Sequence, residues 1–260
     1  MRDVRGVGPD GASVEMAAEM RRRWRRGRFD TSLQQIPSSS EGGGPSICGM
    51  SPTTTIDFVS DVICPWCFIG LQRLEAAITE SGGPASVTFR PFLLDPTIPM
   101  GGVDLRERVA RKFGGDPEVM FARVEAAARE SGIPLDYSKI RRTPNTLLAH
   151  TLLRHAEDKG TQRKLGRALF EAYFLEGRDI GDETVLAELA QGHGFSAEES
   201  SSLLRDEGAF EATRKEAEAL SHQGIRGVPF IVFGGTHAVS GAQPIAIFRE
   251  ALERARREHA

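Results

Sequence analysis

Hydrophobic residues follow two spacings along this chain, one typical of strands and one typical of helices. Residues 53–60 are rich in β-branched and aromatic side chains, which predicts a first strand. Apolar residues three and four apart follow, and Gly82-Gly83-Pro84 ends the helix that they predict. Residues 87–94 predict a second strand. A strand, a helix and a strand in so short a span imply a right-handed βαβ unit with parallel strands.

Residues 104–206 carry helical spacing, interrupted by glycines and by Asp116-Pro117, which resembles an N-cap followed by proline at the first helical position. Apolar stripes, such as the one that contains Leu165 and Phe170, predict packing between helices rather than contacts with a cofactor. We therefore expect a large all-helical insertion. The predicted helices span residues 105–113, 117–131, 143–159, 162–176, 182–193 and 197–205.

The pattern returns to strands after a further helix at residues 210–222. Residues 228–233 predict a strand, Gly234-Gly235 a tight hairpin turn, and residues 237–240 the partner strand. A final helix is expected from Pro244 to about Arg256. The order β-α-β, helical insertion, α-β-β-α predicts one α/β sandwich with the insertion at 104–206, followed by a tail at 255–260.

Residues 1–52 lack this periodicity and are rich in Gly, Ser, Pro and charge, so we expect a disordered leader outside the domain. Its basic cluster at residues 21–28 is interpreted as a solvated arm, with nucleic-acid contact, a targeting signal or a membrane-surface patch as alternatives. Met50 is a candidate start of the functional chain. Cys48 is interpreted as an incidental thiol.

Composition narrows the class of protein. The 260 residues are 40% hydrophobic and 27% charged, as in an ordinary globular protein, and no apolar run is long enough to span a bilayer. A net charge of −3 offers no electrostatic case for nucleic acid or an anionic membrane. Three cysteines are too few for a disulfide-stapled secreted scaffold, and we see no signal peptide. We expect a cytoplasmic, reducing setting.

Candidate chemistry is concentrated in Cys64-Pro65-Trp66-Cys67, which lies between the first strand and the first helix. The free N–H groups and the positive dipole end of a helix start stabilise a thiolate. Pro65 suits the first helical turn, because its φ angle is already helical. We therefore predict that Cys64 is an exposed nucleophile of lowered pKa and that Cys67, one turn further in, is the resolving thiol.

The motif has two other interpretations. A structural zinc site needs a second pair of ligands, and only His150 and His155 have suitable spacing. Two cysteines that merely pack are the third interpretation. The strand-then-helix context favours the redox pair. Asp57 and Asp61 are near enough in sequence to tune the thiols, although Asp61 could simply support the helix start.

A second half of the site is expected late in the chain. The loop that contains Gly224, Gly227 and Val228-Pro229 precedes a strand, and its proline could form a cis peptide bond. In this topology the loop lies opposite the motif. The backbone N–H and C=O of Val228 would then pair with an extended peptide or a thiol-bearing ligand beside Cys64.

These features together resemble the DsbA family, with its thioredoxin-like βαβ–ββα fold. The stretches 58–61, 143–150 and 172–180 resemble its FrnE-like branch, which is close in fold to 2-hydroxychromene-2-carboxylate isomerases and kappa-class glutathione transferases. The resemblance covers residues 53–254. It implies thioredoxin-fold parts at 53–103 and 207–254, and a thiol–disulfide oxidoreductase or isomerase in which Cys64 attacks and Cys67 resolves.

The resemblance also implies partners and further site residues. Disulfide-bearing proteins or small thiols would be the substrates, in contact with Pro65, Trp66, Val228 and Pro229. Glutathione is a candidate co-substrate, and no bound cofactor or metal is expected. The dipeptide between the cysteines differs from the Gly-Pro of thioredoxins and the Pro-His of DsbA. Without a histidine donor to the thiolate, we expect the pKa of Cys64 to be only moderately lowered.

Asn145 and His150 match insertion residues that help to hold glutathione or substrate in the related isomerases and transferases. The alternative is a helix-start turn at Asn145 and a packed histidine. The sequence also permits two functions other than a thiol–disulfide oxidoreductase. One is a glutathione-dependent isomerase or transferase for small aromatic or polyketide-like molecules, although such enzymes often carry serine in place of the first cysteine. The other is a redox-silent peptide-binding protein. Oligomeric state is left open.

Overall fold

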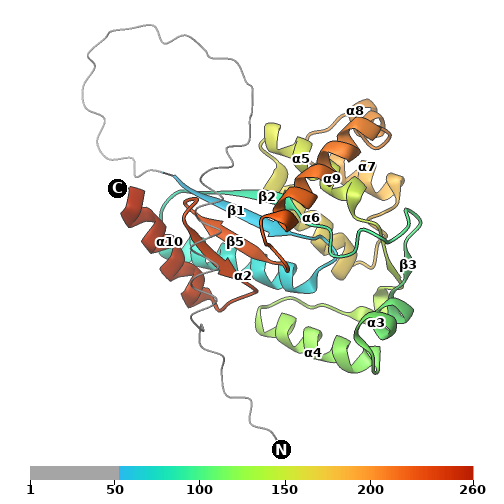
Figure 1. Ribbon diagram of the computed structural model, residues 1–260, viewed down its shortest axis with the longest axis horizontal. Helices are drawn as coiled ribbons and strands as arrows, with labels where there is room; N and C mark the ends of the chain where they lie inside the picture. Colours follow the sequence, from blue (N-terminus) through green and yellow to red (C-terminus); the bar gives the residue numbers. More distant parts are fainter. Residues whose placement is uncertain (1–52, 260) are drawn as a thin grey trace, which may run out of the picture.

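A four-stranded mixed sheet in the order β2-β1-β5-β6 lies at the centre of the molecule (Figure 1). Strand β1 (Thr54–Ser60) is parallel to β2 (Ala85–Pro91) and antiparallel to β5 (Phe230–Phe233), which pairs antiparallel with β6 (His237–Ser240). The predicted parallel βαβ unit and the late hairpin are therefore confirmed. The computed structural model describes residues 53–259, and the predicted leader, with its basic cluster, Cys48 and Met50, lies outside them.

Helices cover both faces of the sheet. Helix α2 (Pro65–Ser81) and helix α10 (Ile245–His259) pack against each other on one face. On the opposite face, Val59 of β1 belongs to a smaller buried cluster with Leu220, from helix α9 (Glu207–His222). Helix α10 continues beyond the predicted end at Arg256, so most of the expected tail is helical. Ala255, the first residue of the expected tail, is buried in the core.

The insertion between β2 and α9 forms two groups of helices. In Figure 1, α3 and α4 lie along one side of α2, and α5 to α8 lie beside the β2 edge together with α9. None of the described helices is long and apolar enough to cross a membrane. The elements of the insertion are β3 (Val103–Asp104), α3 (Leu105–Phe113), α4 (Pro117–Glu130), a 3₁₀ turn (Tyr137–Lys139), β4 (Arg142–Thr143), α5 (Leu147–Asp158), α6 (Gln162–Phe174), α7 (Glu183–Gln191) and α8 (Ala197–Leu203).

The insertion also contains a short antiparallel ribbon of β3 and β4, which the sequence pattern did not predict. Residues 143–146 were expected to begin a helix, but Thr143 pairs with Val103 and the helix begins at Leu147. Proline disfavours helical backbone in the residue before it, which accounts for the strand conformation ahead of Pro144. The Asn145 carboxamide then accepts a hydrogen bond from the Leu147 N–H (2.9 Å) and starts the helix.

Gln162, at the start of α6, joins the insertion to the sheet. Its side-chain oxygen accepts a hydrogen bond from the Phe89 N–H (2.9 Å), and its side-chain NH₂ donates to the Phe89 carbonyl oxygen (3.1 Å). Strand β2 is an edge strand, whose outer backbone groups would otherwise lack partners. One buried side chain thus completes the edge hydrogen bonds at the middle of β2.

A single cluster of buried hydrophobic side chains extends from the sheet through α2 into the insertion. Phe68 of α2 stacks on Phe170 and Phe174 of α6, with ring centroids 5.4 Å and 5.9 Å apart. On the surface above, Arg167 of α6 hydrogen-bonds to Glu75 of α2. The helix that begins with the cysteine motif is therefore held between the sheet and the insertion.

Candidate active site

The cysteine motif occupies the first turn of α2, as predicted. Cys64 is the N-cap residue, with extended backbone angles (φ −90°, ψ 114°), and Pro65 is the first helical residue. The Cys64 carbonyl oxygen accepts hydrogen bonds from the N–H groups of Cys67 (3.0 Å) and Phe68 (3.3 Å). Both cysteines are free thiols. The Cys64 side chain makes no capping hydrogen bond to the helix, and its sulfur lies at the positive end of the helix dipole, which favours a thiolate.

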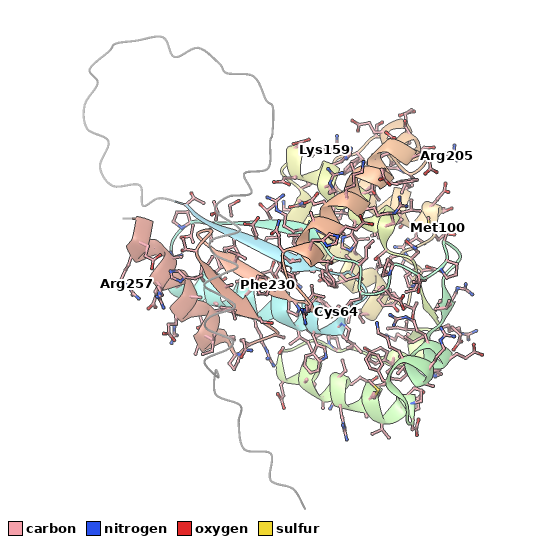
Figure 2. All side chains as sticks on the ribbon, viewed as in Figure 1. Cys64, Met100, Lys159, Arg205, Phe230 and Arg257 are labelled. Carbon is pink, nitrogen blue, oxygen red and sulfur yellow. The ribbon has the colours of Figure 1, made fainter. Side chains whose placement is uncertain are left out.

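Cys64 is less exposed than predicted. Only 4% of its surface is accessible, because the loop before β5 lies over it, and its thiol donates to the Val228 carbonyl oxygen at 3.8 Å. Figure 2 shows Cys64 near the middle of the molecule, where α2 begins at the end of the sheet. Its sulfur is reached through a cleft rather than from the open surface. The expectation of an exposed nucleophile is therefore wrong, although the residue does line a cleft.

Cys67 is fully buried. Burial is the main reason that the pKa of its thiol is raised well above the usual range, and the neighbouring Cys64 raises this pKa further. Burial has this effect because it disfavours the charged thiolate. The two thiols therefore differ in accessibility as the motif predicts, with Cys64 at the cleft and Cys67 behind it.

Asp61 is buried (1% exposed) directly behind the motif. Its backbone carbonyl accepts from the Cys64 N–H (2.9 Å), and its carboxylate accepts from the Leu94 N–H (2.8 Å) and the Ile63 N–H (3.4 Å). A hydrogen bond with the Asp61 backbone lowers the pKa of Cys67, and the Asp61 carboxylate charge makes a smaller contribution that raises it. Asp61 thus supports the start of α2 and also influences the pKa of Cys67, so both of its predicted roles apply.

The second half of the site is the loop before β5. The Val228–Pro229 peptide bond is cis. Val228 is half-buried and lines the cleft with Gly227, whereas Pro229 is buried against α2. A Cβ atom added at Gly70 of α2 would lie 2.9 Å from the Pro229 Cγ, so this glycine permits the close approach of the loop to the helix.

A cleft of about 330 Å³ opens beside Cys64. Its walls come from the motif, from α3 and α4, from the segment that contains Tyr137, from the end of α6 and from the loop before β5. Arg108 and Lys112 of α3 are the charged residues among those that line it. The sequence analysis did not predict this charged wall of the cleft. It could have been found from the helical spacing, which places Arg108 and Lys112 on the same face as Leu105 and Val109.

Asn145 and His150 do not line this cleft. Asn145 donates to the Ile98 carbonyl oxygen (2.6 Å) and accepts from the Leu147 N–H (2.9 Å), so both ends of its carboxamide bind backbone. His150 is 2% exposed, inside the molecule. Neighbouring Arg154 pairs with Glu216 (2.7 Å) instead of pointing into the cleft. Substrate contact by Asn145 or His150 stays a prediction, and the geometry favours the structural alternative.

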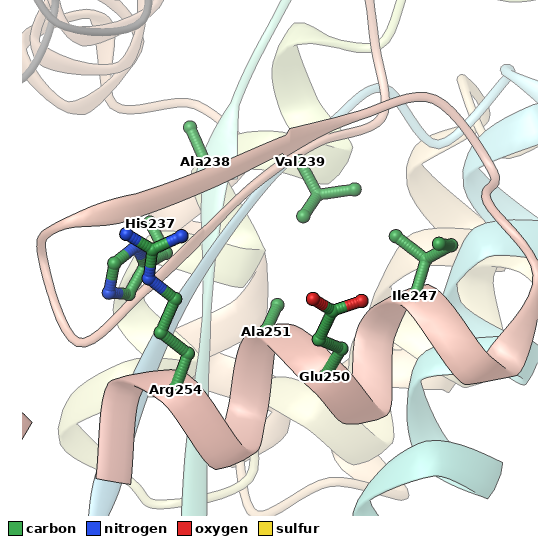
Figure 3. Close-up of a pocket in the computed structure, with 7 residues that line it drawn as sticks. All are labelled: His237, Ala238, Val239, Ile247, Glu250, Ala251 and Arg254. Atoms are coloured by element: carbon green, nitrogen blue, oxygen red, sulfur yellow. The ribbon is translucent and has the colours of Figure 1, made fainter. Parts of the chain in front are cut away.

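A different hollow lies between β6 and α10, away from both thiols (Figure 3). Val239 of the strand and Ile247 of the helix face each other across it, with Glu250 between them. At its end, the His237 Nε2 lies 2.9 Å from a carboxylate oxygen of Glu258. No thiol lines this hollow. Among residues 53–259, no group of three or more His, Cys, Asp and Glu side chains is arranged to hold a metal ion.

Comparison with known proteins places these features in context. A family model described as a DSBA-like thioredoxin domain matches residues 55–253. The uncharacterized protein YwbO of Bacillus subtilis (strain 168) is 25% identical over 202 residues, which are 77% of this chain and 96% of that protein. The crystal structure of a probable DsbA oxidoreductase from Streptomyces coelicolor is 29% identical with a TM-score of 0.71, covering 80% of this chain and 92% of that one. A 2-hydroxychromene-2-carboxylate isomerase is similar in fold alone, with 19% identity, a TM-score of 0.58 and coverage of 79% and 97%.

Proposed function

Because the chain belongs to the DSBA-like thioredoxin domain family, we propose that it is a thiol–disulfide oxidoreductase or isomerase that uses Cys64 and Cys67 on disulfides of proteins or small thiols. The thioredoxin-like α/β fold and the resemblance to the DsbA family, both predicted from the sequence, are confirmed by the family match and the Streptomyces structure. One observation carries the proposal: Cys64 begins a helix, faces a cleft and lies against Val228 of a loop 164 residues later.

Reduction of a substrate begins when the Cys64 thiolate attacks one sulfur of the substrate disulfide. That S–S bond breaks, one substrate thiolate leaves with the electron pair, and the other half stays on Cys64 as a mixed disulfide. Cys67 passes its proton to the departing thiolate and attacks the Cys64 Sγ. The second half of the substrate leaves as a thiolate, and the protein keeps a Cys64–Cys67 disulfide after giving up two electrons. The reverse sequence oxidises a dithiol.

The groups around Cys64 suit an extended or apolar substrate. Trp66 is 43% exposed beside the nucleophile, and its indole offers a broad contact surface. We expect the Val228 backbone to bind a substrate chain by strand-like hydrogen bonds, once the substrate displaces the contact of the Cys64 thiol with the Val228 carbonyl oxygen. Pro65 also lines the cleft, whereas Pro229 is buried behind it, so substrate contact by Pro229 stays a prediction. Substrate binding and attack on its sulfur would thus occur at the same place.

The proposal is tested by trapping. In a Cys67→Ser variant the mixed disulfide on Cys64 cannot be resolved, so we expect covalent partners that dithiothreitol releases. A Cys64→Ser variant, in which the buried Cys67 remains, serves as the matched control and should trap none. Adducts with glutathione alone would favour the isomerase or transferase alternative. The absence of any adduct, together with no disulfide reduction by the wild-type protein, would favour the redox-silent binding protein and sink the proposal.

We further propose a cytoplasmic, reducing setting with glutathione as co-substrate. Three cysteines, two of them in the motif, are too few for a disulfide-stapled secreted scaffold, which supports a reducing setting. Glutathione would return the Cys64–Cys67 disulfide to the dithiol by two successive exchange steps that leave glutathione disulfide. This is checked by incubating the oxidised protein with reduced glutathione and counting free thiols. An unchanged disulfide would exclude glutathione from this role.

A further inference from the structure

The lining of the cleft beside Cys64 combines aromatic rings with positive charge. Its volume of about 330 Å³ lies in the range of pockets that hold small molecules. Phe121 and Tyr137 are stacked with ring centroids 4.2 Å apart, and Phe174 meets Tyr137 nearly at a right angle at 6.5 Å. Phe121 and Tyr137 are only 4% and 6% exposed and already stack on each other. A flat apolar group in the cleft would therefore contact the small part of these rings that lines it, rather than enter between them.

The charge in the cleft has one sign. Arg108 and Lys112 line it, and no acidic residue does. Arg108 is 8% exposed, so its guanidinium is largely shielded from bulk water, and an anion beside it is bound more strongly than at the open surface. Lys112 is more exposed and donates to the Leu94 carbonyl oxygen at 3.2 Å. Arg108 is therefore the stronger anchor for an anionic group.

Asp95 engages only part of Arg108. The Nε and Nη2 atoms both reach the same carboxylate oxygen, Oδ2, at 3.3 Å. The other oxygen of Asp95 accepts from the Thr97 hydroxyl at 2.6 Å. A guanidinium has five N–H donors in a planar fork, and Nη1 has no hydrogen-bond partner within residues 53–259. Arg108 thus keeps donors for a second carboxylate.

We propose that the cleft binds a low-molecular-weight disulfide or thiol in which an aromatic body carries a carboxylate. The ligand sulfur lies at Cys64, its ring lies against Phe121 and Tyr137, and its carboxylate binds Arg108. This inference rests on the proposed function, because exchange with Cys64 is the reaction that consumes such a ligand.

Two aromatic disulfides that differ in charge test the assignment. One is 5,5′-dithiobis(2-nitrobenzoate), which carries a carboxylate on each ring, and the other is the neutral 4,4′-dithiodipyridine. Cys64 attacks one sulfur and releases the first aromatic thiolate, and Cys67 then releases the second. The protein dithiol loses two electrons, and the probe gains them as two thiolates. The rate of thiolate release is measured against probe concentration.

The variant Arg108→Gln is compared with Arg111→Gln, an exposed arginine of the same helix outside the cleft lining. We expect Arg108→Gln to raise the half-saturating concentration of the carboxylate probe about tenfold, as loss of a charge-assisted hydrogen bond implies. The half-saturating concentration of the neutral probe should change by less than about twofold in either variant, because an uncharged ligand gains no attraction from the cations. Attraction by the exposed charge of Arg111 is also screened by salt. If the half-saturating concentration of the carboxylate probe rose equally in both variants, the cations would act only by long-range attraction, and the assignment would be overturned.

A measurement on the wild-type protein keeps the test valid if Arg108→Gln fails to fold. Iodoacetamide, which is neutral, alkylates Cys64 in the presence of 1-naphthoate or of the uncharged 1-naphthamide. We expect the carboxylate to protect Cys64 and the amide to protect it less. Equal protection by both, or none by either, overturns the assignment. So does tighter saturation by glutathione disulfide than by the aromatic carboxylate probe.

This inference and the proposed function fail in different ways. If neither disulfide probe reacts at Cys64 and Cys67→Ser traps nothing, the proposed function is wrong, and the inference falls with it. If the neutral probe still reacts and partners are still trapped, but no preference for the carboxylate is found, the inference alone is wrong.

Discussion

The imidazole Nε2 of His150 lies 3.4 Å from the Oδ1 of Asp61, and both side chains are buried, at 2% and 1% exposed. His150 belongs to α5 of the insertion, whereas Asp61 directly follows β1 and supports the start of α2. The contact lacks the geometry of a hydrogen bond, so Nε2 has no such partner among the described residues. The insertion thus reaches the group behind the cysteines as well as the wall of the cleft in front of them.

Replacing Asp61 by asparagine should lower the pKa of Cys67. The Asp61 charge is one of the contributions that raise this pKa, and an amide of similar shape removes the charge. The titration of Cys67 is measured by NMR in a Cys64→Ser background, so that neither protein contains the Cys64 thiol. Asp57→Asn is the control, because Asp57 pairs with Arg90 (2.9 Å). An unchanged Cys67 pKa in Asp61→Asn would contradict this account.

The reduced protein should lose stability as the pH rises above about 8.5, the ordinary thiol pKa. Below that pH both the folded and the unfolded states keep the Cys67 proton, so the contribution of Cys67 to stability is full. Above it the unfolded state releases the proton while the folded state, with its raised pKa, retains it, and the free energy of unfolding falls.

Denaturant titrations between pH 8 and about 9.5, below the ordinary tyrosine pKa of about 10, measure this effect. Cys67→Ser should flatten the pH dependence. Cys64→Ser should largely keep it, because burial is the main cause of the raised Cys67 pKa. Identical slopes in the Cys67→Ser variant and the wild-type protein would rule out Cys67 as the source.

Gly70→Ala should weaken both the fold and the exchange reaction. The added methyl group would lie 2.9 Å from the Pro229 Cγ, in a ring that cannot rotate away. Overpacking of this kind costs about 1–3 kcal/mol, against a helix-propensity gain of up to about 1 kcal/mol. The loop that carries Val228 must shift, so disulfide exchange at Cys64 should slow.

Gly192→Ala is the matched control for the Gly70 prediction, because its nearest added contact is an ordinary 3.5 Å. Unfolding free energy and the rate with 4,4′-dithiodipyridine are measured for both variants. If the two variants behave alike, the close approach of Pro229 to α2 has no energetic importance.

Gln162→Leu should loosen the insertion from the sheet. Both bonds to Phe89 are lost, and two buried backbone groups of β2 are left without partners. Each such group costs about 1–3 kcal/mol, so we expect the two to lower the unfolding free energy by about 2–6 kcal/mol. Hydrogen exchange of the Phe89 amide should quicken. Gln191→Leu, at an exposed position, should change neither the unfolding free energy nor the exchange rate of the Phe89 amide. An equal loss of unfolding free energy in Gln191→Leu would point to a general effect of leucine.

Much of the fold could be predicted because its signals are local. The β-α-β and late hairpin segments are marked by spacing and by glycine and proline turns, and the place of Cys64 at a helix start follows from its immediate neighbours. The start of α5 was misplaced because Thr143 pairs with the distant Val103, and because Pro144 disfavours helical backbone in the residue before it. The ribbon of β3 and β4 has only two residues in each strand, too few for a period to be seen.

By itself, then, the sequence determined the elements and the chemistry: two thiols in one helical turn after a strand, and a proline loop late in the chain. Only the tertiary structure decided what surrounds them. The burial of Cys64 under Val228, the position of Asp61 against His150 and the cationic wall at Arg108 each join segments that no short-range pattern links. The physical reason is that accessibility and the electrostatic environment of a side chain depend on which distant segments pack around it. In this protein the insertion provides many of those segments.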